Sequence, residues 1–375
     1  MHHVHNGGTN VAMNRSMEMQ GLAGIVLITA ICLSNGGDLA LAQQQPLLPQ
    51  SPEQLGCEVK AAVSRGLEAL ARAVAAYPRH RSCFSCHHQT LPMLAQVTAT
   101  SRGFPAANGQ QLQDQLRLTI ASFEKQAVSM NEGRGVGGRA MTVAYGLWAV
   151  SLAGETSNAT TDAMVEYLLK TQRQEGHWTG QMCRPPLEES YQTCTVLAVQ
   201  GLRKHVSKTR QHAADEAIAK AKTWLITAPA KSQEDRVARL WGLSMLDAVP
   251  VEIAMAREAT LKTQRPDGGW AQLDEMESDA YATGQTLYVL NATGLNTDDE
   301  SYRRGKRFLI KSQREDGNWR VESRSKPVQP YFPSDDEDPL GKDQFISIAA
   351  TSWAVTALAI AVNDGVAEPG PKIMP

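Results

Sequence analysis

A nine-residue pattern that occurs three times restricts the fold of this chain more than any other feature of its sequence. The copies occupy residues 170–178, 262–270 and 311–319, and all fit the form K-[ST]-Q-R-x-[DE]-G-x-W. Each copy follows one segment of helical character and precedes a second that is rich in Ala, Thr, Val and Leu. Such self-similarity predicts a repeat architecture, in which the 375 residues form one larger body instead of two domains.

The spacing of the copies predicts the number of repeats. Gln264 follows Gln172 by 92 residues, whereas Gln313 follows Gln264 by 49, so one unit without the pattern fits at residues 217–248. Two further helical pairs precede the first copy. Because the alternation typical of strands is absent, we expect an all-α fold of about six helical hairpins.

The two helical segments of each hairpin differ in composition. The first carries more charge, and the second is smaller and more apolar. This difference is expected when the second helices crowd around an axis and the first helices face solvent. Since no polar capping repeat is visible at the C-terminus, we expect the hairpins to close into a ring and not to stack as an open solenoid.

The repeated pattern resembles the QW-type motif of the squalene/hopene cyclase and protein prenyltransferase repeats, over roughly residues 112–362. The resemblance implies an α/α toroid. In that family the Gln ties its loop to a neighbouring repeat, and the Trp packs at the end of a helix. It therefore implies structural and not catalytic roles for Gln172, Trp178, Gln264, Trp270, Gln313 and Trp319.

The N-terminus resembles an export signal. Residues 22–33 form an apolar run that is too short for a permanent membrane span, and Arg15 precedes it. We expect a signal peptide that is cleaved after Ala42, with Met13 as a possible true start; a single-span anchor is the alternative. A periplasmic or secreted protein with no other membrane span should then contain a leader at 1–42, a linker at 43–56, one toroid domain at 57–362 and a tail at 363–375.

A Cys-x-x-Cys-His segment, residues 83–87, replaces the repeated pattern in the first hairpin. Cys83 and Cys86 stand about one helical turn apart, and His87 follows directly. This spacing is typical of c-type haem attachment, because the two thiols can reach the vinyl groups of one porphyrin edge while the imidazole binds the iron. We therefore expect a covalent haem c with His87 as an axial ligand, and the export signal agrees with this chemistry.

Other interpretations of this segment remain open. In an oxidising compartment Cys83 and Cys86 can form a disulfide, either redox-active or structural. Together with His87 or His88 they can bind zinc, although no second ligand pair is evident. The spacing can also be a coincidence. The remaining cysteines of an exported chain could pair among themselves: Cys57, Cys183 and Cys194.

Two expected inner-helix N-termini share the form [DE]-x-Y-x-T. The acid and the tyrosine are Glu189 and Tyr191 in one copy, and Asp279 and Tyr281 in the other. In a closed ring both carboxyl groups would face one mouth, where one acts as a general acid and the tyrosines line a pocket. The alternative is an acid that only favours a helix N-terminus. The D-x-D-D acid motif of class II triterpene cyclases is absent.

The charge of the chain limits its polar partners. There are 37 Lys and Arg against 39 Asp and Glu, so no global basic field exists to hold nucleic acid or an anionic membrane. The Gly-rich segment at residues 133–138 does not follow a strand. A phosphate-cradling role therefore has weak support, and no nucleotide cofactor is expected.

These features predict an exported toroid in which one haem c serves electron transfer or redox chemistry on or near an apolar, isoprenoid-like molecule, together with a redox partner protein. Two alternatives stay open. The first is a non-redox enzyme of the cyclase or lyase type that uses Asp279 or Glu189 as an acid. The second is a non-catalytic binding scaffold with a Cys83–Cys86 disulfide. The sequence thus leaves open whether the chain is an enzyme.

Overall fold

The structure is a computed structural model that describes residues 52–105, 109–181, 183–326, 330–332 and 340–362. The expected leader at 1–42 and the expected tail at 363–375 lie outside the described residues. The expected linker at 43–56 overlaps the first helix, which begins at Pro52.

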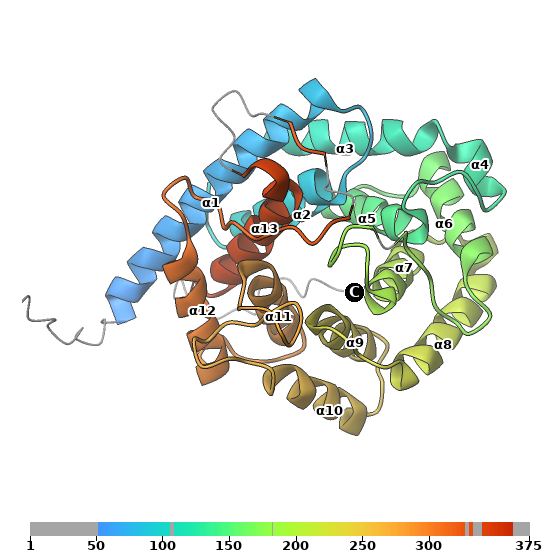
Figure 1. The fold of residues 1–375 in the computed structure, drawn as a ribbon. Helices are drawn as coiled ribbons and strands as arrows, with labels where there is room; N and C mark the ends of the chain where they lie inside the picture. Colours follow the sequence, from blue (N-terminus) through green and yellow to red (C-terminus); the bar gives the residue numbers. More distant parts are fainter. Residues whose placement is uncertain (1–51, 106–108, 182, 327–329, 333–339, 363–375) are drawn as a thin grey trace, which may run out of the picture. The chain divides into compact units, whose positions relative to one another are not determined.

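Twelve long helices of the described chain alternate between an outer and an inner layer (Figure 1). The outer helices are α1 (Pro52–His80), α3 (Gly109–Glu124), α6 (Ala159–Thr171), α8 (Gln211–Thr227), α10 (Pro250–Leu261) and α12 (Glu300–Ser312). The inner helices are α2 (Leu91–Thr100), α5 (Arg139–Leu152), α7 (Tyr191–His205), α9 (Gln233–Met245), α11 (Ala280–Ala292) and α13 (Gln344–Ile360). Shorter helices are η1 (Cys86–Thr90), α4 (Ala127–Asn131), η2 (Lys208–Arg210) and η3 (Gly341–Asp343).

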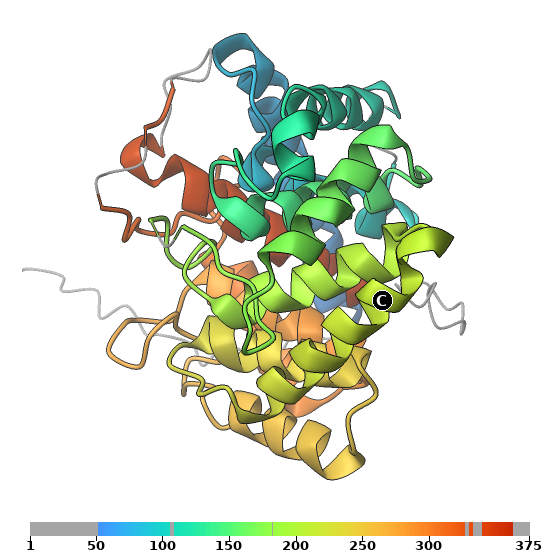
Figure 2. The same ribbon diagram turned by 90° about the vertical axis from the view of Figure 1, so that its right-hand side faces the viewer.

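The inner helices form a closed ring. Each packs against the next, and the last, α13, packs against α1 and α2 at the start of the chain. The prediction of an all-α toroid of six hairpins is therefore confirmed. Figure 2 shows that the connections leading into α7, α11 and α13 gather at one side of the ring, which is called the mouth below.

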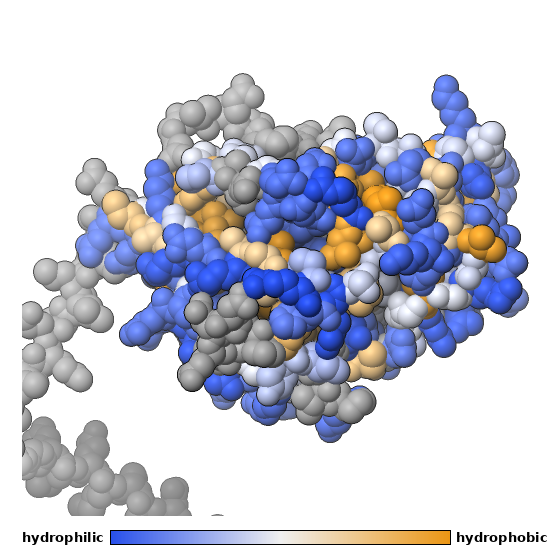
Figure 3. Space-filling model, turned by 90° about the horizontal axis from the view of Figure 1, so that it is seen from above, coloured by the Kyte–Doolittle hydropathy of each residue, from blue (hydrophilic) through white to orange (hydrophobic). Residues whose placement is uncertain are grey.

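The sequence of each helix explains its layer. All residues of α13 are buried, whereas α12 buries only Tyr302, Gly305 and Leu309, which recur at helical spacing on one face. The segment Gly341–Ile360 is long and apolar enough to cross a membrane by composition alone, but its apolar window of 18 residues is buried inside the ring, as in core helices. On the face drawn in Figure 3, apolar residues reach the surface only in small patches between polar ones.

The repeated pattern forms three equivalent loops at residues 170–178, 262–270 and 311–319, the Gln–Trp loops. In each, the Gln side chain donates to the carbonyl of the loop glycine and to a carbonyl of the following outer helix; the second acceptor is Ala217 for Gln172 and Ser301 for Gln264. The third copy closes the ring, because Gln313 donates to Ala62 of α1 at 2.9 Å. The structural role expected for the glutamines is confirmed.

The tryptophans fix these loops from the inside. Trp178, Trp270 and Trp319 are buried, and each indole N–H donates to a carbonyl of the preceding outer helix at 2.7–3.0 Å. Each tryptophan backbone N–H also donates to a threonine of the following inner helix, namely Thr195, Thr283 and Thr351. These three threonines are therefore equivalent positions of the repeat.

The glycines of the Gln–Trp loops allow each loop to lie close to the backbone of the next outer helix. Gly317 has a φ of +86°, and a Cβ atom there would stand 2.4 Å from the carbonyl oxygen of Arg65. Gly176 and Gly268 meet the next outer helix in the same way. A side chain at these positions would be strained by the backbone and would collide with the neighbouring repeat.

Candidate functional site

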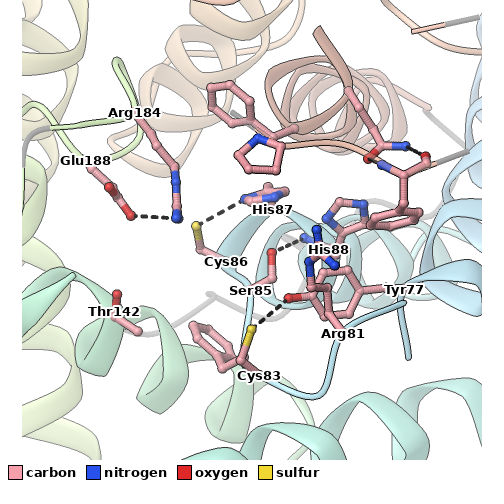
Figure 4. A pocket seen from close by; sticks show the side chains of 15 residues that line it. Tyr77, Arg81, Cys83, Ser85, Cys86, His87, His88, Thr142, Arg184 and Glu188 are labelled. Atoms are coloured by element: carbon pink, nitrogen blue, oxygen red, sulfur yellow. Dashed lines mark hydrogen bonds and ion pairs between the residues drawn. The ribbon is translucent and has the colours of Figure 1, made fainter. Parts of the chain in front are cut away.

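A small pocket opens at the mouth of the ring, where the expected haem segment lies (Figure 4). Its volume is about 150 Å³. The walls come from the end of α1, from residues 83–88, from Thr142 of α5, from the loop before α7 and from the start of α13. This mouth pocket is lined by titratable side chains, among them Tyr77, Cys83, Cys86, His87, His88, Arg184 and Glu188.

The backbone around the cysteines forms an unusual helix. Residues 86–90 make a single π-helical turn, and all five are buried. Ser85 caps it, because its hydroxyl accepts from His88 N at 3.3 Å while Ser85 N donates to the Gln89 side chain at 2.6 Å. Single π-helical turns occur often at functional sites, since they redirect side chains that an α-helix would stack.

The thiol of Cys86 lies 3.7 Å from Nδ1 of His87. Burial raises the pKa of Cys86 to about 12, and burial lowers the pKa of His87 well below its usual value, with His88 and Arg184 adding to the effect. Both groups are therefore neutral at pH 7. Cys83 is exposed and approaches the Tyr77 hydroxyl at 3.5 Å.

His88 is more deeply buried than Cys86 and His87. Its ring is 4.6 Å from that of Tyr77 and 5.3 Å from that of Phe332, and neither ring nitrogen has a hydrogen-bond partner among the described residues. Burial lowers the pKa of His88 to about 3. Buried polar atoms without partners are rare in folded proteins, so this position is energetically unfavourable unless another group binds there.

The mouth pocket does not fit a haem in this conformation. Pockets that enclose a drug-sized molecule measure about 300–1,000 Å³, and a porphyrin is no smaller than such a molecule. The imidazole of His87 is buried, with its ring 4.7 Å from that of His88 and 5.6 Å from that of Phe345. Haem attachment therefore stays a prediction from the sequence.

The other interpretations of the cysteines are tested by the same geometry. Over the described part of the chain, no three His, Cys, Asp or Glu side chains come together as a metal site, so the zinc interpretation has no support. None of the disulfides considered above is formed, because these cysteines are free thiols: Cys57, Cys83, Cys86, Cys183 and Cys194.

The two predicted acids lie at inner-helix N-termini but outside the lining of the mouth pocket. Asp279 is the N-cap of α11 and accepts from Ala282 N at 2.9 Å, while its second oxygen has no partner among the described residues. Burial raises the pKa of Asp279 to about 6. Glu189 is bound by Arg324 at 2.8 Å. Asp279 thus has the position that the alternative interpretation gave it, an acid at a helix N-terminus. Glu189 instead forms an ion pair with Arg324.

The two tyrosines of the shared form do not have equivalent positions. Tyr191 is half-buried with its ring 5.5 Å from that of His177, whereas Tyr281 is fully buried. Neither tyrosine lines the mouth pocket, and the expectation that both line one pocket stays a prediction. The hydrogen bonds to the tryptophan backbone make Thr195 and Thr283 equivalent positions of the repeat. When the two helices are aligned on these threonines, Tyr281 corresponds to residue 193 and not to Tyr191.

The acid that the sequence did not reveal is Glu234, in the first turn of α9. It is buried, and its Oε1 accepts from the Thr193 hydroxyl at 2.7 Å and from the Gln285 amide at 3.0 Å. Its Oε2 has no partner among the described residues. Burial raises the pKa of Glu234 to about 7, although these hydrogen bonds oppose the shift. The sequence signal, an acid beginning an inner helix, was hidden in the unit that lacks a Gln–Trp loop.

Four buried groups are near enough to influence one another's pKa and are called the axial cluster below, namely Cys86, Tyr145, Glu234 and Tyr281. Burial raises the pKa of both tyrosines well above their usual value, and the neighbouring Glu234 and Cys86 groups add to the shift. The Tyr281 hydroxyl lies beside the Glu234 carboxyl group but makes no hydrogen bond of good geometry within the described chain. Cys86 belongs both to this cluster and to the mouth pocket.

Comparison with solved structures supports the fold. The type II terpene cyclase MstE from Scytonema, in complex with merosterolic acid A, matches 83% of this chain and 99% of its own, with 14% identity and a TM-score of 0.52. A complex of the same cyclase with geranylgeranyl dihydroxybenzoate has 14% identity and a TM-score of 0.51, and the match again covers 83% of this chain and 99% of the cyclase chain. A protein from Actinoplanes matches 81% of this chain and 100% of its own, with 15% identity and 0.52.

At this level of identity the likeness shows the fold alone, which is that of the terpenoid cyclases. No protein-family model matches the chain, and comparison with curated proteins gives no match.

Proposed function

We propose that this protein is an enzyme that performs acid–base chemistry on an apolar small molecule bound within the toroid, with Glu234 as its acid. The observation that carries the proposal is the buried carboxyl group of Glu234, with one oxygen free of partners beside an equally unpartnered Tyr281 hydroxyl. A buried acid with a perturbed pKa and unused bonding capacity is a feature of catalytic sites.

The pKa of Glu234 limits the chemistry. An acid is most effective when its pKa lies near the working pH, and about 7 meets that condition. Such a weak acid transfers its proton readily to the oxygen of a leaving group but poorly to an isolated alkene. We therefore favour a lyase-like elimination or an oxygen-assisted cyclisation over the direct protonation of a hydrocarbon chain.

The substrate class follows from the lining and the fold. The ring interior is built from apolar inner helices, and the polar groups of the axial cluster are few. The structurally similar cyclase from Scytonema was solved with a geranylgeranyl compound, which supports an isoprenoid-like molecule that also carries oxygen. Cys86 lines the mouth pocket and also influences the pKa of Tyr281 in the axial cluster.

The test compares Glu234→Gln with the wild type on a panel of oxygenated isoprenoids, with products separated by mass spectrometry. We expect turnover to fall by roughly 10²–10⁴-fold. The matched control is Glu258→Gln, because Glu258 lies exposed on α10 and, among the described residues, forms an ion pair only with Lys262. Turnover that survives in Glu234→Gln would contradict the role of this acid.

The same variant has a second readout in stability. The pKa of Glu234 is about 7 in the folded protein and 4.5 in the unfolded chain. The stability that the protonated carboxyl group contributes is therefore fully present below pH 4.5 and is lost as the pH rises through 7. The loss amounts to about 3 kcal/mol, to which Asp279 adds in the same direction. Glu234→Gln should unfold with a flatter pH profile over this range.

Covalent haem c at Cys83 and Cys86 is a second proposal, together with the redox role, the redox partner and the export that it requires. The spacing of the motif and the exposure of Cys83 at the pocket edge favour it. Protein made in a host that matures c-type cytochromes should then show a Soret band and a haem-sized mass increase on the peptide that contains both cysteines. Their absence would remove this proposal and leave the acid–base proposal intact.

A further inference from the structure

A second cavity, the rim pocket, shares no lining residue with the axial cluster. It measures about 430 Å³ and is enclosed by the loop of residues 133–140, by the end of α6 and by the first Gln–Trp loop. The helices that contribute to these walls, α5 and α6, are neighbours in Figure 1. Its lining contains Arg134, Arg139, Lys170 and Arg173 and no acidic side chain.

Two of the four cations remain without a counter-charge. Arg134 pairs with Glu132, and Lys170 pairs with Glu166 at 3.3 Å. Arg139 and Arg173 make no ion pair with any residue that the structure describes. A pocket that gathers four cations and neutralises only two carries a local positive charge, although the whole chain is close to neutral.

The start of α5 lies in the same pocket through Arg139 and Ala140, and the backbone N–H of Arg139 already donates to Val136 O at 3.2 Å. This helix has 14 residues, and no side chain caps its N-terminus. A helix N-terminus favours an acid in its first turn, yet the residue here is Arg139, held at a φ of +58° that non-glycine residues rarely adopt. A cation in this position is unfavourable by charge and by backbone, and a bound anion would offset the electrostatic part.

We propose that the rim pocket binds a phosphate or diphosphate group. The planar guanidinium groups of Arg139 and Arg173 can each grip two phosphate oxygens, and Lys170 supplies a further charge. Gly135, at a φ of +87°, allows the loop to pack closely on α4, because a Cβ atom there would lie 2.5 Å from Ser129 Cβ. The Gly-rich segment, for which the sequence alone gives a phosphate-cradling role only weak support, is thus one wall of the proposed anion site.

The rim pocket is distinct from the mouth pocket, since the two share no lining residue. They are nevertheless neighbours. A Cβ atom at Gly138 would lie 2.0 Å from Thr142 Oγ1 and 3.7 Å from Glu188 Oε1, and both residues line the mouth pocket. The anion site does not depend on Glu234, so its test is independent of the proposed reaction.

The test is titration calorimetry of the full chain with pyrophosphate at low and high salt, and sedimentation with phosphatidylcholine vesicles that contain phosphatidic acid. The variant is Arg139→Gln combined with Arg173→Gln. The matched control, Arg303→Gln with Arg307→Gln, removes two arginines that pair with Glu300 on α12. Thermal unfolding confirms that each variant is folded.

We expect pyrophosphate to bind the wild type in a salt-dependent manner and the pocket variant to bind roughly tenfold more weakly or worse, since two charged contacts are lost. The control should bind as the wild type does. Binding to the vesicles alone, with the same dependence on the variants, would support the site and identify a lipid headgroup as the source of the phosphate. Absence of binding to both probes, or equal binding by pocket and control variants, would overturn the proposal.

Discussion

The Gln–Trp loops and the segment at residues 81–90 occupy the same place between an outer and an inner helix, but they use their polar groups differently. In the Gln–Trp loops the repeated glutamine and indole donors all have carbonyl partners, as Gln313 and Trp319 illustrate. In the first hairpin both ring nitrogens of His88 and the amide nitrogen of Gln89 are buried without partners among the described residues.

This difference separates loops that hold the ring together from a loop with unused bonding capacity. A satisfied polar group stabilises its fold modestly, whereas an unsatisfied one costs about 1–3 kcal/mol. If the Gln–Trp loops are structural, removing one of their hydrogen-bonded side chains should lower the free energy of unfolding strongly. A binding role predicts small losses, or gains, when an unpartnered group of the first hairpin becomes apolar.

The largest effect should come from Trp319→Ala. The indole is buried, packs close to Gly66 of α1 and donates to Leu309 O at 2.7 Å. We expect unfolding free energy to fall by about 3–5 kcal/mol, measured by chemical denaturation. Trp224→Ala, at a half-buried position, is the control and should cost less. Equal losses would show that the loop has no special structural role.

His88→Leu tests the first hairpin, and the quantity measured is the pH dependence of the free energy of unfolding. The pKa of His88 is about 3 in the folded protein and 6.5 in the unfolded chain. The stability that the neutral imidazole contributes to the folded state is therefore fully present above pH 6.5 and is lost as the pH falls toward 3. Between pH 7.5 and pH 5 the wild type should lose about 2 kcal/mol that the variant keeps. The exposed His212→Leu is the control. A loss for His88→Leu at every pH would make this histidine structural.

Gln313→Ala should give the smallest of the three effects. It removes the two hydrogen bonds that Gln313 donates to Gly317 and Ala62 and the one that it accepts from Arg65 of α1, and we expect a loss of roughly 1–2 kcal/mol in the free energy of unfolding. Gln211→Ala, which removes an exposed glutamine that bonds only Asp215, should be neutral. If Gln313→Ala proved as neutral as the control, ring closure would not depend on this contact.

The shared form [DE]-x-Y-x-T shows where sequence reasoning failed. Aligning its two copies letter by letter made Tyr191 and Tyr281 equivalent. The hydrogen bonds from the tryptophan backbone to Thr195 and Thr283 shift that alignment by two residues, which is about 200° around a helix. On the corrected register, Thr193 and Tyr281 are equivalent, and both face Glu234.

The sequence by itself determined the hairpins, their layers and the loops that join them, because a repeated local pattern reports helix ends, turns and apolar faces directly. It also determined the structural role of residues such as Gln172 and Trp178. Only the tertiary structure decided which polar side chains meet. The acid Glu234, its neighbour Tyr281 and the cations Arg139 and Arg173 are brought to their sites by the rotation of whole helices within a closed ring, and that rotation depends on contacts between distant repeats.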